Sequence, residues 1–175
     1  MEQLNSIMWT LNEKANIAMS CLPKNGSTSM RNCNPTGAIL KNEEVLSVPV
    51  RVAWIRNPLD RMQSAYSFFF YLNERGSNGR TIPSIDDTRS WENFVDLVLT
   101  TENMHWCKQV EALTHDGIYV PTVTHKFEDI MELWGNYLPG LLPWQNACSK
   151  LPINDYRSDD IEEYYKEDFK IWRGL

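Results

Sequence analysis

Residues 15–30 read ANIAMSCLPKNGSTSM, an apolar run followed by a polar turn. The apolar run, residues 15–22, predicts a short buried strand that ends at Pro23. A glycine and several hydroxyl side chains follow, and such residues are typical of a turn that opens a helix. Backbone N–H groups at a helix start bind anions, Gly26 allows a close approach, and Lys24 adds positive charge. The junction is a candidate anion site, and the alternative is a plain turn with a solvated lysine.

A second apolar run, VPVRVAWI at residues 48–55, predicts a strand that is covered on both faces. Asn57 and Pro58 follow it, and proline suits the first position of a helix. Residues 59–72 carry apolar and aromatic side chains at helical spacing. A strand, turn and helix that return to a second strand indicate an α/β fold with a central parallel sheet.

The rest of the chain predicts short helices joined by loops. Residues 73–90 are polar and predict a long loop of the kind that often binds or covers a ligand. Ser90 is a candidate N-cap for the helix that follows this loop. We expect helices over 91–99, 109–113, 127–134 and 158–172, a strand over 117–120, and irregular chain over 138–144.

Composition bounds the class of protein. With 175 residues, the chain is expected to form a single domain, residues 1–175. A net charge of −6 argues against a general nucleic-acid binder. No apolar run approaches the ~20 residues that span a bilayer, and the N-terminus does not resemble a secretory signal, so we expect a cytoplasmic protein without a membrane partner. The cysteines are widely spaced, which predicts free thiols rather than a disulfide framework or zinc site: Cys21, Cys33, Cys107 and Cys148.

Arg56 marks a second candidate site at the carboxyl end of the second strand, where open α/β sheets bind ligands. Ser64 lies two helical turns further on and can face the same crevice. A guanidinium forks onto a phosphate, and a hydroxyl completes such a site. The alternatives are an arginine that caps its strand and a small residue in helix packing. The ATP-binding motif GxxxxGK[ST] is excluded because Lys24 precedes Gly26.

These two segments resemble the sulfotransferase superfamily, whose members use 3′-phosphoadenosine 5′-phosphosulfate (PAPS). Residues 23–28, PKNGST, resemble the family's 5′-phosphosulfate loop. Arg56, Ser64 and Tyr66 fit the family's 3′-phosphate pattern RxPxxRxxSxY.

Later segments resemble the Golgi carbohydrate sulfotransferases. Residues 104–109 (MHWCKQ) resemble the HWxPQ element, residues 124–129 (THKFED) the GKFE element, and residues 164–169 (YYKEDF) the terminal YxxDF helix. The segments occur in the family's order, although Lys108 stands where that family has proline. Without a membrane anchor or stem, the chain resembles a small cytoplasmic member, of bacterial or viral origin.

The resemblance implies a P-loop-like parallel sheet flanked by helices, and transfer of a sulfuryl group from PAPS to an acceptor hydroxyl, on a carbohydrate or another small molecule, by in-line displacement. It implies that Lys24 stabilises the bridging oxygen of the leaving phosphate. The residues implied to hold the 5′-phosphate are Asn25, Gly26, Ser27 and Thr28, and those implied to hold the 3′-phosphate are Arg56 and Ser64. No metal is expected, because the lysine and the helix start supply positive charge.

A general base is expected among the histidines and carboxylates. His105 is the candidate that lies in a family-like segment, and a neutral imidazole can take the acceptor's proton. Its alternative role is that of a packed histidine beside Trp106. Carboxylates without motif support are Glu43, Glu44 and Glu102. The loop 73–90, with Arg75, Arg80 and Arg89, is a candidate cover for the acceptor.

Two other functions remain open at the level of sequence. A module that binds PAPS or a glycan without transfer would keep the same residues. A P-loop kinase would need a lysine after the glycine and an acidic Mg²⁺ ligand, and the lysine is in the wrong place. The sequence leaves the acceptor and the oligomeric state open.

Overall fold

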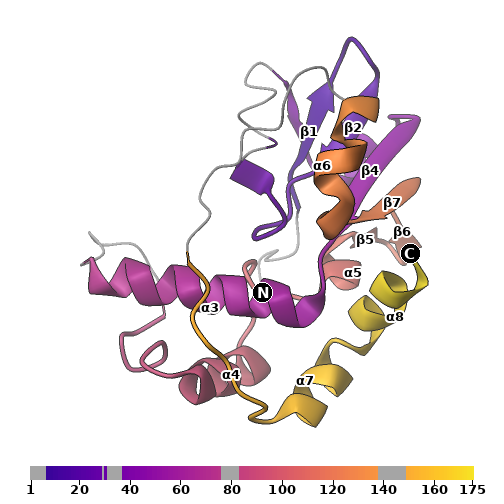
Figure 1. The fold of residues 1–175 in the computed structure, drawn as a ribbon. Coiled ribbons are helices and arrows are strands. Elements are labelled where there is room, and N and C mark those ends of the chain that lie inside the picture. Colours follow the sequence, from indigo (N-terminus) through magenta and orange to yellow (C-terminus); the bar gives the residue numbers. More distant parts are fainter. Residues whose placement is uncertain (1–6, 29, 31–36, 76–82, 138–148) are drawn as a thin grey trace.

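The computed structural model describes residues 7–28, 30, 37–75, 83–137 and 149–175. The predicted irregular stretch 138–144 lies outside these residues, as do Cys33, Cys148 and part of the predicted loop 73–90. A five-stranded sheet with the order β3-β1-β2-β4-β7 forms the upper layer in Figure 1. Its strands are β1 (Trp9–Asn12), β2 (Ile17–Ser20), β3 (Ile39–Leu40), β4 (Val50–Ile55) and β7 (Val123–Lys126).

The centre of the sheet is parallel. β2 pairs with β4, with Met19 opposite Val52, and β4 pairs with β7, with Trp54 opposite His125. Both predicted strands are therefore present and lie side by side in the predicted orientation. Their carboxyl ends point toward the helix that follows β4 (Figure 1).

The sheet as a whole is mixed, so the expectation of a parallel sheet holds only for these three strands. β1 pairs antiparallel with both β2 and β3. A tight turn joins β1 to β2, and Asn16 in this turn adopts a left-handed φ of 52°. Such a short connection permits only a hairpin, because a parallel pair needs a crossover of a dozen or more residues.

The helices form a second layer and short connections. They are α2 (Asn42–Val45), α3 (Pro58–Glu74), α4 (Trp91–Thr100), α5 (Gln109–Ala112), α6 (Ile130–Leu133), α7 (Ser158–Tyr164) and α8 (Lys166–Gly174). Short 3₁₀ turns, η1 (Phe127–Asp129) and η2 (Trp134–Asn136), flank α6, and β5 (Thr114–His115) pairs with β6 (Ile118–Tyr119) in a separate hairpin. Figure 1 shows α3 running beneath the sheet, with α4 and α7 below it.

Side-chain caps fix the starts of α3 and α4, two helices that the sequence predicts. Asn57 accepts hydrogen bonds from the N–H groups of Leu59 and Asp60, with Pro58 at the first helical position. Ser90 accepts from the N–H of Asn93 at 3.2 Å and starts α4 as predicted. The predicted terminal helix 158–172 is instead two helices, α7 and α8, which meet at a break at Tyr165.

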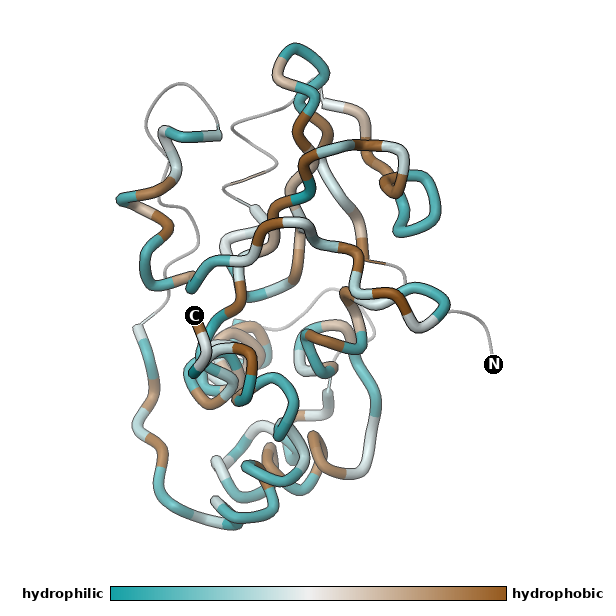
Figure 2. The backbone as a smooth tube through the Cα atoms, turned by 90° about the vertical axis from the view of Figure 1, so that its right-hand side faces the viewer, coloured by the Kyte–Doolittle hydropathy of each residue, from teal (hydrophilic) through white to brown (hydrophobic). Residues whose placement is uncertain are grey.

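Alternation along β2 and β4 buries both faces of the sheet. Met19, Val52 and Trp54 pack against Ile130 and Trp134 on one face. The other face contributes Ala18, Ala53 and Ile55 to a cluster that includes Leu113 of the α5 region. Hydrophobic chain accordingly runs along the strands, and hydrophilic chain forms the projecting turns (Figure 2). This pattern is the one expected of strands covered on both sides.

A third cluster lies between helices α3, α4, α7 and α8 and is rich in aromatic side chains. Its buried members include Phe69, Phe94, Trp106 and Phe169. Along the described parts of the chain, no helix has the length and apolar character needed to cross a bilayer.

Candidate anion-binding site

The turn after β2 leads into helical residues, as the sequence predicts. Lys24 and Gly26 both adopt left-handed φ values, 68° and 76°. Residues 27, 28 and 30 are helical, and the N–H of Met30 donates to the carbonyl of Gly26 at 3.0 Å. A Cβ at Gly26 would lie 3.0 Å from Phe127 Cε2, so this position favours glycine for both its backbone angle and its close packing.

Arg56 reaches this turn from the end of β4. Its Nη1 donates to the carbonyl oxygen of Lys24 at 2.8 Å, and its guanidinium lies 5.2 Å from the ring centroid of Phe127. Lys24 and Arg56 are both half-buried. The structure thus brings together the two segments that the sequence assigns to phosphate binding.

Asn25 enters the site in a different way from the one expected. Its backbone N–H donates to the carbonyl of Leu22 at 3.1 Å and is engaged within the turn. Its side chain is 1% exposed and ties the turn to the sheet. By contrast, the N–H groups of Gly26 and Thr28 donate to no acceptor within the described chain. These two N–H groups make residues 26–28 the candidate anion-binding part of the turn.

Ser64 lies on the face of α3 that contacts this turn. On this face Arg61 donates through Nε to the carbonyl of Pro23 at 3.1 Å. The Lys24 ammonium lies over the ring of Phe68, 4.0 Å from its centroid. Ser64 is three residues after Arg61 and four before Phe68, which places it on the same helical stripe. Within the described chain, Ser64 makes no direct hydrogen bond to Arg56.

Arg61 is a site residue that sequence analysis missed. A surface ion pair with Asp60 is one role open to it from sequence, but Arg61 is 1% exposed, and Asp60 pairs with Lys150 at 2.6 Å. Besides Pro23, its guanidinium donates to the carbonyls of Cys107 at 2.6 Å and Met104 at 3.1 Å. The signal was present as the second arginine of the pattern RxPxxRxxSxY.

Lys24 and His105, the two predicted catalytic residues, lie against one aromatic ring. The His105 imidazole stacks on Phe68 with centroids 6.0 Å apart and an interplanar angle of 13°. Phe69 meets the same imidazole edge-on at 5.0 Å. The Lys24 ammonium, also on Phe68, is close enough to His105 to affect its pKa.

His105 is neutral at physiological pH. Burial lowers its pKa from 6.5 to about 4, and the positive charges of Lys24 and Arg61 add to the shift. The Oδ1 of Asn103 accepts the backbone N–H of His105 at 3.0 Å and lies 2.9 Å from its Nδ1. An amide oxygen only accepts, so Nδ1 carries the proton and Nε2 the lone pair. His105 can therefore accept a proton through Nε2, but with low basicity.

The carboxylates offered as alternative bases have other surroundings. Glu44 accepts the backbone N–H of Lys41 at 2.8 Å and caps α2. Glu102 is exposed and lines a shallow depression near Lys108 and Tyr164. Neither residue contacts the turn at Lys24 among the described contacts.

The later motif-like segments converge on the same site. Gln109 and Val110 donate their N–H groups to the carboxylate of Asp168 at 2.7 and 2.8 Å. Burial raises the pKa of Asp168, and these N–H groups oppose that shift. The Glu128 carboxylate accepts the N–H of Asn57 at 3.2 Å. Residues from 104–109, 124–129 and 164–169 thus surround the end of β4, a proximity that sequence order alone does not reveal.

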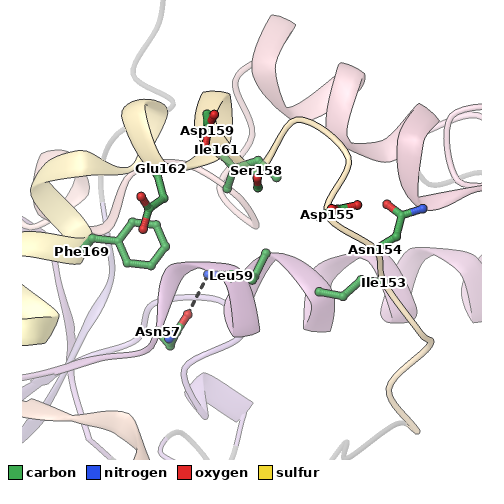
Figure 3. Close-up of a pocket in the computed structure, with 10 residues that line it drawn as sticks. All are labelled: Asn57, Leu59, Ile153, Asn154, Asp155, Ser158, Asp159, Ile161, Glu162 and Phe169. Atoms are coloured by element: carbon green, nitrogen blue, oxygen red, sulfur yellow. Dashed lines mark hydrogen bonds between the residues drawn. The ribbon is translucent and has the colours of Figure 1, made fainter.

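A cavity of about 570 Å³ lies elsewhere, between the start of α3 and the pair α7 and α8. Figure 3 shows its lining residues, and among them Asp155, Asp159 and Glu162 are acidic. Its lining includes no cationic side chain and neither Lys24 nor Arg56. This charge makes the cavity unsuitable for a phosphate, so we place the candidate anion site at the turn after β2.

Comparison of the chain with family models, curated proteins and solved structures finds no match.

Proposed function

We propose that this chain is a cytoplasmic, PAPS-dependent sulfotransferase that transfers a sulfuryl group to an acceptor hydroxyl on a carbohydrate. The observation that carries this proposal is the hydrogen bond from Arg56 to the Lys24 carbonyl at 2.8 Å. It joins a cationic side chain at the end of one parallel strand to a lysine-bearing turn at the end of the next. Two candidate phosphate-binding sites that lie side by side in this way suit a nucleotide with phosphates at both its 3′ and 5′ positions.

Different residues form the 5′-phosphate site and the 3′-phosphate site. The helix start at Gly26, Ser27 and Thr28 would bind the 5′-phosphate through backbone N–H groups and hydroxyls. Arg56 would bind the 3′-phosphate, with the Ser64 hydroxyl on the facing stripe of α3. The 3′-phosphate site would distinguish PAPS from ATP, which has no 3′-phosphate.

Sulfuryl transfer would proceed by in-line displacement. The acceptor oxygen bonds to sulfur while the bond from sulfur to the bridging phosphate oxygen breaks, and its electron pair leaves with adenosine 3′,5′-bisphosphate. Lys24 would stabilise the negative charge that grows on that bridging oxygen. The acceptor's proton would pass to Nε2 of His105, which holds a lone pair at neutral pH. The lysine and the helix start supply the positive charge, so no metal is part of the proposal.

A binding module without transfer is the second candidate, and one observation favours it. A pKa of about 4 makes His105 a weak base, which limits how readily it takes a proton from a hydroxyl. This candidate shares the donor site and differs only in the chemical step.

The test is transfer of labelled sulfate from PAPS to a panel of glycans. We expect product with the natural chain, and a loss of about 10²-fold or more with Lys24→Ala, the size seen when a transition-state donor is removed. Lys170→Ala, on the exposed surface, is the matched control and should retain activity. Failure to transfer to any glycan by a chain that binds adenosine 3′,5′-bisphosphate would favour the binding module.

A further inference from the structure

The side-chain amide of Gln109 makes two hydrogen bonds to the backbone of Arg56. Its Oε1 accepts from the Arg56 N–H at 3.1 Å, and its Nε2 donates to the Arg56 carbonyl at 2.9 Å. β4 ends at Ile55, so Arg56 is the first residue beyond the strand. The amide therefore holds Arg56 as a neighbouring strand would, by pairing both of its backbone polar groups.

The same Gln109 oxygen also holds the turn after β2. Asn25 Nδ2 donates to Gln109 Oε1 and to the carbonyl of Trp54, both at 2.7 Å. Both amide hydrogens of Asn25 and both lone pairs of the Gln109 oxygen are then used, which fixes the orientation of the two amides. Gln109 is 0% exposed and touches both halves of the candidate site.

Asp168 anchors Gln109 from the other side. The carboxylate comes from α8, is 1% exposed, and accepts the N–H groups of Gln109 and Val110 at the start of α5. These bonds fix the backbone from which the Gln109 side chain extends. Residues far apart in sequence thus form one buried chain of hydrogen bonds from Asp168 through Gln109 to Asn25 and Arg56.

We propose that Gln109 is a positioning residue that sets the placement of the Arg56 backbone relative to the turn at Lys24. It thereby sets the spacing between the 3′-phosphate site and the 5′-phosphate site. The effect of Gln109 on ligand binding rests on the proposed function. Its hydrogen bonds to Arg56 and to the turn after β2 do not depend on that function.

The chemistry of the side chain suits glutamine to this position. Glutamate would offer oxygens to Asn25 and to the Arg56 N–H but would have no donor for the Arg56 carbonyl. Asparagine has the same groups on a side chain one methylene shorter. Methionine has nearly the same length and shape and neither donor nor acceptor of useful strength, which makes Gln109→Met the most informative variant.

The first test measures amide hydrogen exchange without any ligand. In Gln109→Met we expect the Arg56 amide, which loses its acceptor, to exchange on the order of tenfold faster or more relative to amides of the β1–β2 hairpin. Leu113→Ala is the matched control, because Leu113 is 0% exposed and lies next to α5, and its apolar side chain cannot hydrogen-bond to Arg56 or Asn25. It should lower stability without this local change. Unchanged relative exchange at Arg56 in Gln109→Met would overturn the positioning role.

The second test measures affinity for adenosine 3′,5′-bisphosphate and for AMP by calorimetry. We expect Gln109→Met to reduce the preference for the bisphosphate on the order of tenfold, and Leu113→Ala to leave this ratio unchanged. An equal ratio of the two affinities in Gln109→Met and the natural chain would contradict a role of Gln109 in spacing the two phosphate sites. Should the natural chain itself show no preference, the proposed function fails while the exchange result still decides the positioning role.

Asp168→Asn is the second variant and covers the case in which Gln109→Met does not fold. Asparagine retains one oxygen to accept an N–H and loses the other, so we expect faster exchange at Gln109 and a smaller increase at Arg56. An increase at Gln109 with none at Arg56 would show that the two are not coupled and would overturn the proposal.

Discussion

The guanidinium of Arg56 donates to the backbone carbonyl of Lys24 at 2.8 Å. Lys24 itself holds a left-handed φ of 68°, a conformation that costs free energy in a residue with a Cβ. The contact therefore ties the end of β4 to the one residue of the turn whose backbone is strained and whose side chain is the candidate catalytic cation. This geometry allows the strain and the charge of Lys24 to be separated by substitution.

Lys24→Gly and Lys24→Ala both remove the charge, but only glycine relieves the backbone strain. We expect Lys24→Gly to be more stable than Lys24→Ala by about 1 kcal/mol, because glycine adopts positive φ without steric cost. Chemical unfolding of the two variants checks this. Equal stability would mean that the turn relaxes to another conformation when the side chain is shortened.

Gly26→Ala should destabilise the protein by about 1 to 3 kcal/mol, since its φ is 76° and a Cβ would meet Phe127 at 3.0 Å. Gly174→Ala is the control, because nothing lies within 4 Å of a Cβ there. Its effect should stay within about 0.5 kcal/mol. Thermal or chemical unfolding gives both values, and similar losses in the two variants would contradict the close packing at Gly26.

Arg61→Met should cost about 2 to 4 kcal/mol, because it leaves the carbonyls of Pro23, Cys107 and Met104 without their donor. Arg89→Met is the control: Arg89 pairs with Asp86 at 3.8 Å on the exposed surface, and its loss should be close to neutral. Unfolding in denaturant measures both. A neutral Arg61→Met would show that methionine packing replaces the polar contacts.

Acidification should destabilise the protein through His105. Its pKa is lowered to about 4 in the folded chain and is 6.5 in the reference state, so the unfolded chain binds more protons between these values. The contribution of His105 to stability is complete above pH 6.5 and is lost as pH falls toward about 4. We expect His105→Gln to show a shallower decline of unfolding free energy over this interval. Parallel curves for both proteins would contradict a buried neutral histidine.

The sequence predicts best those helices and strands whose own residues favour their conformation without help from neighbouring elements. Residues 52–55 of β4 are all apolar, and α3 carries an apolar face, a proline start and the Asn57 cap, so the sequence of each segment predicts its structure. β1 and β7 were missed because both are short and carry polar residues, and their strand conformation depends on pairing with β2 and β4. Tertiary pairing of this kind overrides weak local preference.

The site divides in the same way. The strand-to-helix turns at Lys24 and Arg56 have local signatures, and the structure brings them into contact. The roles of Arg61, Gln109 and Asp168 depend on hydrogen bonds to residues distant in sequence, and no local pattern encodes such a partner.

Calorimetric titration with adenosine 3′,5′-bisphosphate, with AMP as the comparison ligand, tests the donor site most directly. We expect micromolar or tighter binding of the bisphosphate, much weaker binding of AMP, and loss of this difference in Arg56→Ala. Arg89→Ala should bind as the natural chain does. Absence of binding, or equal affinity for ligands with and without the 3′-phosphate, would contradict a PAPS site at the turn after β2.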